Sequence, residues 1–289
     1  MNICSTIEKA SVKALALGGF DGLHIAHRAI IDRLGEGGAL LAIEHNRVCL
    51  TPGCVRERFC PVPVVILPLE QIRELTPREF IALLQSEFVN LKRLIVGYDF
   101  RFGKDRAAGG EELRKIFSGE TIIVPEITFG GSAVHAARIR SLLLDGNVRG
   151  AARLLNRPHL VEGEIIHGQG LGSERLYPTI NLSTRLFLAP QDGVYASWTE
   201  INKKRYRSVA FVGRRLSADG AFSIETHIIE ENANSDEFAN ADRAAIFFID
   251  RIRGNRRFDD LEALKEQIGK DICAAKDILA QEELRCKDL

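Results

Sequence analysis

The chain has 289 residues, 45% of them hydrophobic and 27% charged, which is the balance of a globular protein and excludes a disordered one. It carries 39 Lys and Arg against 39 Asp and Glu, so its formal net charge is zero. Residues 1–155 carry +3 and the remainder −3, which excludes the strongly basic field expected of a nucleic-acid binder.

The first half of the chain alternates strand-like and helix-like segments. Apolar runs predict strands at 12–17, 39–43, 62–67, 91–96 and 121–124. Periodicity and capping residues predict helices at 25–34, 76–88 and 111–117. This alternation is typical of a parallel sheet covered by helices, so we expect a Rossmann-like α/β domain over residues 1–157.

The sequence pattern changes near Pro158, and the second half predicts a small antiparallel β-barrel over residues 158–289. Short runs between glycines and polar turns predict strands at 160–166, 193–200, 206–212, 222–229 and 244–252. A closing helix is expected from Asp259, with Leu261, Leu264, Ile268 and Ile272 at helical spacing on its apolar face.

The cysteines and the N-terminus indicate the compartment. The six cysteines form no C-x-x-C pair and no regular framework, so free thiols in a reducing compartment are expected: Cys4, Cys49, Cys54, Cys60, Cys273 and Cys286. The alternative is a metal cluster of Cys49, Cys54 and Cys60 with His45, whose spacing matches none of the usual zinc patterns. No apolar run approaches the roughly 18 residues that cross a membrane, and the polar N-terminus has no signal-peptide core. We therefore expect a cytoplasmic protein without membrane partners.

The most informative stretch is residues 18–27, Gly-Gly-Phe-Asp-Gly-Leu-His-Ile-Ala-His, at the join of the first strand and first helix. Open α/β sheets bind ligands at such joins, and glycines let the backbone approach a phosphate closely. His24 and His27 are three residues apart, so both rings are expected on one side of the first helical turn. Two imidazoles there can donate hydrogen bonds to triphosphate oxygens. The alternative is a packing turn with two incidental histidines.

This stretch resembles the G-x-F-D-G-x-H-x-G-H motif of bacterial bifunctional riboflavin kinase/FAD synthetases. Residues 96–104 are similar to a second block of that family, V-G-x-[DN]-F-R-F-G-x. The resemblance implies that the first domain transfers AMP from ATP to FMN, making FAD and releasing pyrophosphate. It implies phosphate contacts for His24 and His27, a nucleotide turn shaped by Gly19, Phe20 and Asp21, and Asp99 beside the flavin–nucleotide cleft. From its position alone, Asp99 is equally a turn residue.

Three segments depart from the family pattern. Ala26 replaces a glycine, and residues 42–47 are a degraded form of T-F-[DE]-P-H-P. At the family's [VI]-S-S-T-x-I-R signature, His135, Ala136 and Ala137 replace the hydroxyl side chains, and only Arg140 remains to hold phosphate. Alanine neither donates nor accepts hydrogen bonds, so adenylyl transfer is left open.

The second half has its own candidate site. Gly168, Gly170 and Gly172 alternate in a β context and suggest a phosphate flap, followed by Pro-Thr-Ile-Asn at 178–181. The oxygens of Thr179 and Asn181 suit Mg²⁺ that also touches ATP, whereas the plainer alternative is a turn with Asn at a cap. The segment resembles the riboflavin kinase domain, which implies metal and nucleotide contacts for Thr179 and Asn181. By the same resemblance Glu225 is the general base, taking the proton of the ribityl 5′-hydroxyl. Ser173 and Leu176 depart from the pattern.

The leading hypothesis is thus a bifunctional enzyme that phosphorylates riboflavin to FMN and adenylylates FMN to FAD, with ATP as co-substrate and Mg²⁺ as cofactor. One alternative is a riboflavin kinase whose first domain is inactive. Others are a non-catalytic flavin or nucleotide binder and an α/β protein of unknown role. Small molecules are the expected partners, and the sequence gives no oligomeric state.

Overall fold

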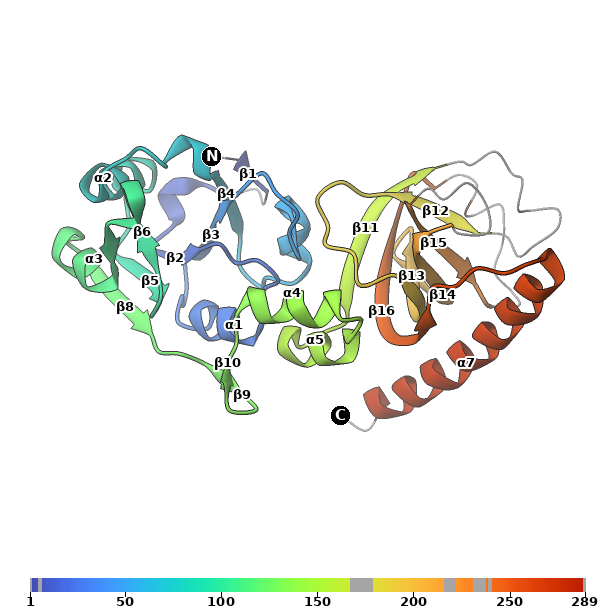
Figure 1. The fold of residues 1–289 in the computed structure, drawn as a ribbon. Coiled ribbons are helices and arrows are strands. Elements are labelled where there is room, and N and C mark those ends of the chain that lie inside the picture. Colours follow the sequence, from blue (N-terminus) through green and yellow to red (C-terminus); the bar gives the residue numbers. More distant parts are fainter. Residues whose placement is uncertain are drawn as a thin grey trace. The chain divides into compact units, whose positions relative to one another are not determined.

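The computed structural model describes residues 2–4, 7–166, 179–215, 222–230, 238 and 241–287. The chain forms two compact units, Met1–Ala136 and Ala137–Leu289 (Figure 1). The expected boundary at 157/158 lies later than this division. Helices α4 (Ala136–Leu144) and α5 (Val148–Leu155) account for the difference, because α5 packs against barrel strands of the second unit.

The first unit is built on a six-stranded sheet in the order β1-β4-β3-β2-β5-β8. Its strands are β1 (Asn2–Ile3), β2 (Ala14–Gly18), β3 (Gly38–Glu44), β4 (Val64–Pro68), β5 (Arg93–Gly97) and β8 (Glu120–Val124). The last five are parallel to one another, and β1 is antiparallel to β4. The predicted parallel sheet is confirmed, and its strand order reverses between β2 and β5. Ligands bind at such a reversal in open α/β sheets.

Helices cover both faces of this sheet: α1 (Ile25–Ile31), α2 (Pro77–Glu87) and α3 (Gly110–Ile116). Thr76 and Glu79 form the predicted capping box at the start of α2. The remaining elements are short: η1 (Lys9–Ser11), η2 (Gly53–Arg58), η3 (Leu69–Gln71) and η4 (Lys104–Arg106), with the two-stranded pairs β6 (Arg101–Phe102)/β7 (Ala108–Gly109) and β9 (Thr128–Phe129)/β10 (Ser132–Ala133).

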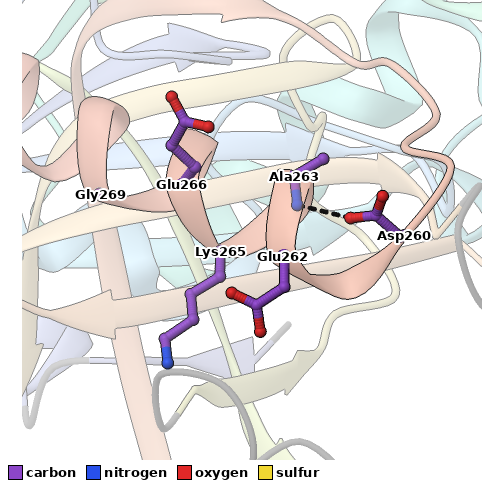
Figure 2. A pocket seen from close by; sticks show the side chains of 6 residues that line it. All are labelled: Asp260, Glu262, Ala263, Lys265, Glu266 and Gly269. Atoms are coloured by element: carbon purple, nitrogen blue, oxygen red, sulfur yellow. Dashed lines mark hydrogen bonds between the residues drawn. The ribbon is translucent and has the colours of Figure 1, made fainter.

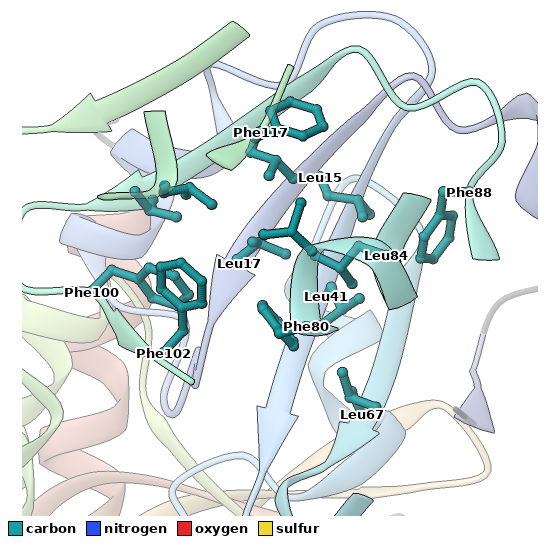
Figure 3. Close-up of a cluster of buried hydrophobic side chains, with 14 of the residues drawn as sticks. Leu15, Leu17, Leu41, Leu67, Phe80, Leu84, Phe88, Phe100, Phe102 and Phe117 are labelled. Carbon is teal, nitrogen blue, oxygen red and sulfur yellow. The ribbon is translucent and has the colours of Figure 1, made fainter. Parts of the chain in front are cut away.

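Two apolar layers follow from the alternation of side chains along the strands. Leu15 and Leu17 of β2 pack with Phe80 of α2 in the cluster drawn in Figure 3. Ala14 and Ala16 face the other layer, which contains side chains of α1. Burial on both faces explains why these strands read as continuous apolar runs in the sequence.

The second unit contains a closed antiparallel barrel in the order β11-β12-β15-β14-β13-β16. Its strands are β11 (His159–Ile166), β12 (Ile180–Ser183), β13 (Gly193–Ile201), β14 (Lys204–Arg214), β15 (Phe222–Ile228) and β16 (Arg243–Gly254). Helix α7 (Leu261–Lys287) packs against β13, β14 and β16. The predicted barrel and closing helix are confirmed.

The two faces of the barrel wall differ in chemistry. Val194, Val209 and Phe211 belong to the cluster under α7, so they lie on the outer face. Residues that alternate with them point inward, among them a fully buried chain of hydroxyls formed by Ser197, Ser208, Thr199 and Thr226, with oxygen separations of 2.6–2.8 Å. Each hydroxyl has a partner, as buried polar groups require.

The expected apolar face of α7 is confirmed at Ile272, which packs against the barrel cluster, but it does not reach the first turn of the helix. Leu261 is 52% exposed, whereas Ala275 and Leu279 are fully buried against the barrel. The helix is also held by Asp271, a buried carboxylate whose Oδ2 accepts from Arg253 Nη2 of β16 at 2.7 Å. The first turn extends beyond the apolar contact, so the expectation is wrong at Leu261.

One expectation about the cysteines is wrong. Cys4 and Cys54 form a disulfide, with Cα atoms 5.3 Å apart, while Cys49, Cys60 and Cys273 are free as expected. Pairing of the chain beside β1 with β4 brings Cys4 to the η2 segment, a tertiary contact with no signature in the sequence. Cys54 is therefore unavailable to the alternative metal cluster. Among the described residues, no three His, Cys, Asp or Glu side chains are grouped as metal ligands.

Replacing Cys54 by serine is expected to lower the free energy of unfolding of the first unit by about 2–4 kcal/mol, because the disulfide restrains the unfolded chain. The bridged residues are 50 positions apart, so the loop it closes is long. Hydrogen exchange read by mass spectrometry in increasing urea measures each unit separately. Cys273→Ser, which removes an exposed thiol of α7, is the control. A first unit with the same free energy of unfolding in both variants would contradict the expectation.

Candidate functional site

The turn after β2 is a strained segment that leaves backbone exposed. Phe20 and Leu23 have positive φ angles of 46° and 45°, which side-chain-bearing residues rarely adopt. The Phe20 ring covers Gly18, where an added Cβ would lie 3.3 Å from it. Gly19 is exposed, and the nearest atom to a Cβ built there is 3.9 Å away. A ligand can thus approach the main chain at Gly19 closely.

The two histidines lie together, as their spacing predicted. Their rings stack with centroids 3.6 Å apart, and the edge of Phe20 meets His27 at 5.1 Å. His24 is 3% exposed and caps α1, because its Nδ1 accepts from the His27 backbone N–H at 3.4 Å. In a neutral His24 ring the proton is then on Nε2, which makes Nε2 the donor.

Asp21, predicted to shape the turn, does so by binding a neighbouring loop. Its Oδ1 accepts from the backbone N–H groups of Leu50 and Thr51 at 2.7 and 3.2 Å. In return the Thr51 hydroxyl accepts from the Gly22 N–H at 2.8 Å. These bonds join the turn to the segment between β3 and η2.

A buried arginine, not identified in the sequence, lies behind the same turn. Arg56 is 1% exposed, and its Nη1 donates to Glu44 Oε1 at 2.6 Å and to the Gly53 carbonyl at 3.1 Å. Its Nη2 donates to the Gly19 carbonyl at 3.4 Å. Glu44 Oε1 also accepts from the Gly53 N–H at 2.8 Å.

The end of β5 forms the other side of the reversal point. Asp99 folds back over Gly97, since a Cβ on Gly97 would lie 3.2 Å from Asp99 Oδ1 and 3.5 Å from Ile30 of α1. His135 Nδ1 lies 3.8 Å from Asp99 Oδ2. The predicted nucleotide-turn residues and Asp99 therefore share one edge of the sheet, flanking α1.

Tyr98 connects His135 to Glu126, in the segment that follows β8. Its hydroxyl donates to Glu126 Oε1 at 2.6 Å and lies 3.0 Å from His135 Nε2. The hydrogen bond to Glu126 raises the pKa of Tyr98 to about 12, so the phenol keeps its proton. Because that proton is directed to Glu126, the Tyr98 oxygen is an acceptor toward His135.

In the barrel, the predicted kinase residues meet across two strands that are distant in sequence. Asn181 of β12 pairs in register with Glu225 of β15, and Glu225 pairs with Phe211 of β14. The Glu225 side chain is 18% exposed and lies on the outer face, opposite the buried hydroxyl chain. Ser223 Oγ donates to Glu225 Oε1, and Arg215 Nη1 lies 4.0 Å from the same oxygen.

Comparisons with known proteins agree with this architecture. A family model described as riboflavin kinase (Flavokinase) matches residues 155–279. The bifunctional riboflavin kinase/FMN adenylyltransferase of Pseudomonas fluorescens is 28% identical and covers 91% of this chain and 92% of its own. This chain is thus similar over most of its length to a bifunctional enzyme that carries both activities in its name. The member from Escherichia coli K12 is 28% identical, with 91% of both chains covered, and that from Bacillus subtilis 168 is 26% identical, with 91% of this chain and 92% of its own covered.

A solved structure also has a similar fold along most of the chain. The "Crystal Structure of Macrolide-efflux Protein from Streptococcus pneumoniae" has a TM-score of 0.80 and 27% identity, covering 96% of this chain and 97% of its own. In the parts of this chain that the structure describes, no helix is long and apolar enough to span a bilayer.

Some predicted residues fall outside both the group around the turn after β2 and the group around Asn181 and Glu225. Gly168, Gly170 and Gly172 lie outside the described residues. Arg140 lies on α4 and belongs to the second compact unit, so its role stays a prediction. Ala136 and Ala137 open α4 directly after His135, and they leave that position without hydroxyls.

The residues around Asn181 suit the magnesium ion that the resemblance implies. Thr179, exposed before β12, and Asn181 are two positions apart, which places both on one side of an extended chain, beside Glu225. The Thr179 hydroxyl and the Asn181 amide each offer an oxygen ligand, the type that Mg²⁺ prefers. The residues therefore fit a magnesium ion.

The hollow in Figure 2 lies elsewhere. Its described lining comes from the start of α7: Asp260, Glu262, Ala263, Lys265, Glu266 and Gly269. Asp260 Oδ1 accepts from the Ala263 N–H at 2.7 Å and so caps the helix. The lining shares no residue with either cluster, and we assign it no part in the chemistry.

Proposed function

We propose that the chain makes FMN and FAD at two separate sites, by phosphorylating riboflavin in the barrel and adenylylating FMN at the reversal point of the parallel sheet. The observation that carries the proposal is the pairing of Asn181 with Glu225 on the outer face of a closed barrel. It lies within residues 155–279, which match the riboflavin kinase model. The named relatives, aligned over 90% or more of this chain, carry both activities in their names.

In the kinase reaction Glu225 acts as the general base. The ribityl 5′-oxygen forms a bond to the γ-phosphorus of ATP, the bond from that phosphorus to the β,γ-bridging oxygen breaks, and ADP leaves. The hydroxyl proton passes to the Glu225 carboxylate. The Ser223 hydroxyl fixes the orientation of that carboxylate, and the guanidinium of Arg215 adds positive charge nearby. Thr179 and Asn181 would hold Mg²⁺, which would supply positive charge against the phosphates.

Asn181→Leu is expected to raise the Mg²⁺ concentration needed for half-maximal FMN formation, since it removes an oxygen ligand while keeping the side chain's size. The loss of one hydrogen bond or ligand to a charged group, worth about 1.5–3 kcal/mol, predicts a change of about tenfold or more. Titrating Mg²⁺ at saturating ATP measures it. Asn181→Asp, which restores an oxygen, is expected to recover most of the affinity; a Leu variant with the wild-type Mg²⁺ requirement would exclude the role.

In the adenylyl transfer, the phosphate oxygen of FMN attacks the α-phosphorus of ATP and pyrophosphate leaves. His24 Nε2 and the ring of His27 donate to the phosphates and stabilise the charge that develops during displacement. Gly19 gives the nucleotide access to the main chain, and Asp99 borders the flavin side. His135 stands where the family signature carries a hydroxyl, and Arg140 retains its phosphate role from the same signature.

We place the two reactions in the domains 1–157 and 158–289 and in the cytoplasm, with ATP, riboflavin and FMN as the only partners proposed. The start of the matched family model at residue 155 supports the domain division. The monofunctional alternative gains no support, because the named relatives combine both activities.

Flavin chromatography tests the proposal. Purified protein is incubated with ATP and Mg²⁺ and either riboflavin or FMN, and the products are resolved by fluorescence. We expect FMN and then FAD from riboflavin, and FAD directly from FMN. FMN alone would support the monofunctional kinase, and the absence of both products would leave only a binding protein.

A further inference from the structure

The turn that carries Gly19 is not held in shape by its own sequence. Two side-chain-bearing residues, Phe20 and Leu23, take left-handed conformations that cost free energy and persist only where surrounding contacts impose them. Asp21 and Thr51 supply one set of these contacts, which join the turn to the segment between β3 and η2. At the start of the turn, the Gly19 carbonyl accepts a hydrogen bond from Arg56 and, among the described residues, from no other group.

Holding a loop with a buried arginine costs free energy, because the charge loses its hydration. A cation that is 99% buried must be paired, and Arg56 is paired with Glu44 at 2.6 Å. Even so, its Nε is buried without a hydrogen-bond partner among the residues that the structure describes. An apolar side chain of similar volume would fill the space without this penalty, but it would not donate to the Gly19 carbonyl.

The guanidinium geometry explains why arginine is suited to this position. One nitrogen binds Glu44 at the end of β3 and Gly53 at the start of η2, and a second nitrogen reaches Gly19. The planar fork thereby fixes the turn relative to the central strands of the sheet. Lysine keeps the charge but has a single nitrogen, which cannot reach the two sites from fixed directions.

We infer that Arg56, anchored by Glu44, is a positioning residue for nucleotide binding, which sets the Gly19 main chain in the shape that ATP phosphates require. This inference rests on the proposed adenylyl transfer. It assigns Arg56 no contact with substrate. It predicts that loss of the Gly19 contact weakens ATP binding at this site, whereas riboflavin phosphorylation in the barrel is unaffected.

The test measures FAD formation from FMN with ATP varied. Arg56→Lys is expected to raise the KM for ATP by about ten- to a hundredfold, the scale of a misplaced binding group, with the KM for FMN and the rate of riboflavin phosphorylation unchanged. Arg93→Met is the control, because Arg93 makes an exposed ion pair of 2.6 Å with Glu120 at the opposite edge of the same sheet. Arg56→Met, lacking charge, tests whether the pair is needed for folding.

Different results would contradict the role of Arg56 and the proposed adenylyl transfer. A folded Arg56→Lys protein with the wild-type KM for ATP would overturn the inference, as would an equal rise in Arg93→Met. If Arg56→Met fails to fold, the Lys variant, checked by its urea unfolding, decides the matter. If wild-type protein makes no FAD, the proposed function fails, and calorimetry with ATP on the Glu225→Gln background decides the inference: weaker binding by Arg56→Lys supports it, and equal or absent binding overturns it.

Discussion

Replacing Glu225 by glutamine is expected to lower the rate of FMN formation from riboflavin by about 10²- to 10⁴-fold, the usual contribution of a general base. Glutamine keeps the size and the hydrogen bond from Ser223 but cannot take the ribityl proton. FAD formation from added FMN is expected to continue at the wild-type rate, because Glu225 belongs to the barrel and the adenylyl site to the parallel sheet.

Glu200→Gln is the matched control. Glu200 lies on barrel strand β13, its side chain is 16% exposed, and it pairs with Arg205 at 3.0 Å, much as Glu225 is partly buried near Arg215. Initial rates of both half-reactions are compared for the two variants. A Glu225→Gln enzyme that phosphorylates riboflavin as fast as Glu200→Gln would remove Glu225 from the mechanism.

His27→Ala is expected to have the opposite effect, lowering adenylyl transfer by about 10²- to 10³-fold, as for the loss of one donor to developing charge. The ring stacks on His24, so its removal also takes away one of the contacts that orient that imidazole. Riboflavin phosphorylation in the same preparation is expected to be unchanged and reports that the barrel is intact.

A second substitution distinguishes chemistry from packing. His27→Gln keeps a side-chain N–H donor and is expected to retain more adenylyl transfer than His27→Ala, whereas a purely packing role would make the two variants alike. Pyrophosphate release from FMN and ATP measures both. Wild-type rates in His27→Ala would contradict the phosphate role.

Much of the fold followed from local patterns. Strand β2 was recognisable because an apolar run ends in Gly18-Gly19, and α2 because Thr76, Pro77 and Glu79 form a helix start. Strand β12 gave no apolar run, since four residues with one buried side chain have little periodicity, and only its Pro-Thr-Ile-Asn motif indicated an extended chain. Helix α5 was also missed, although Asn147 caps it and Val148, Ala151 and Leu155 have helical spacing, so a usable signal was present.

Part of the candidate site also followed from local patterns, and part depended on the fold. The stacking of His24 and His27 followed from helix geometry, which is local. The pairing of Asn181 with Glu225 needed the barrel order, because β12 and β15 are separated in sequence by two other strands. Arg56 gave no signal, since arginines in a charged run are usually solvated; its burial depends on Glu44 and Gly19, which only the fold brings close. The Cys4–Cys54 disulfide was missed for the same reason.

The most direct test of two separate phosphoryl-transfer sites follows the phosphorus atoms. Wild-type protein, riboflavin and Mg²⁺ are incubated with ATP labelled at the γ- or at the α-phosphorus, and the flavins are separated and counted. We predict γ-label in FMN and in FAD, and α-label in FAD alone. Flavins that never acquire α-label, or FMN that carries it, would contradict the assignment of kinase chemistry to Glu225 and adenylyl transfer to the histidine pair.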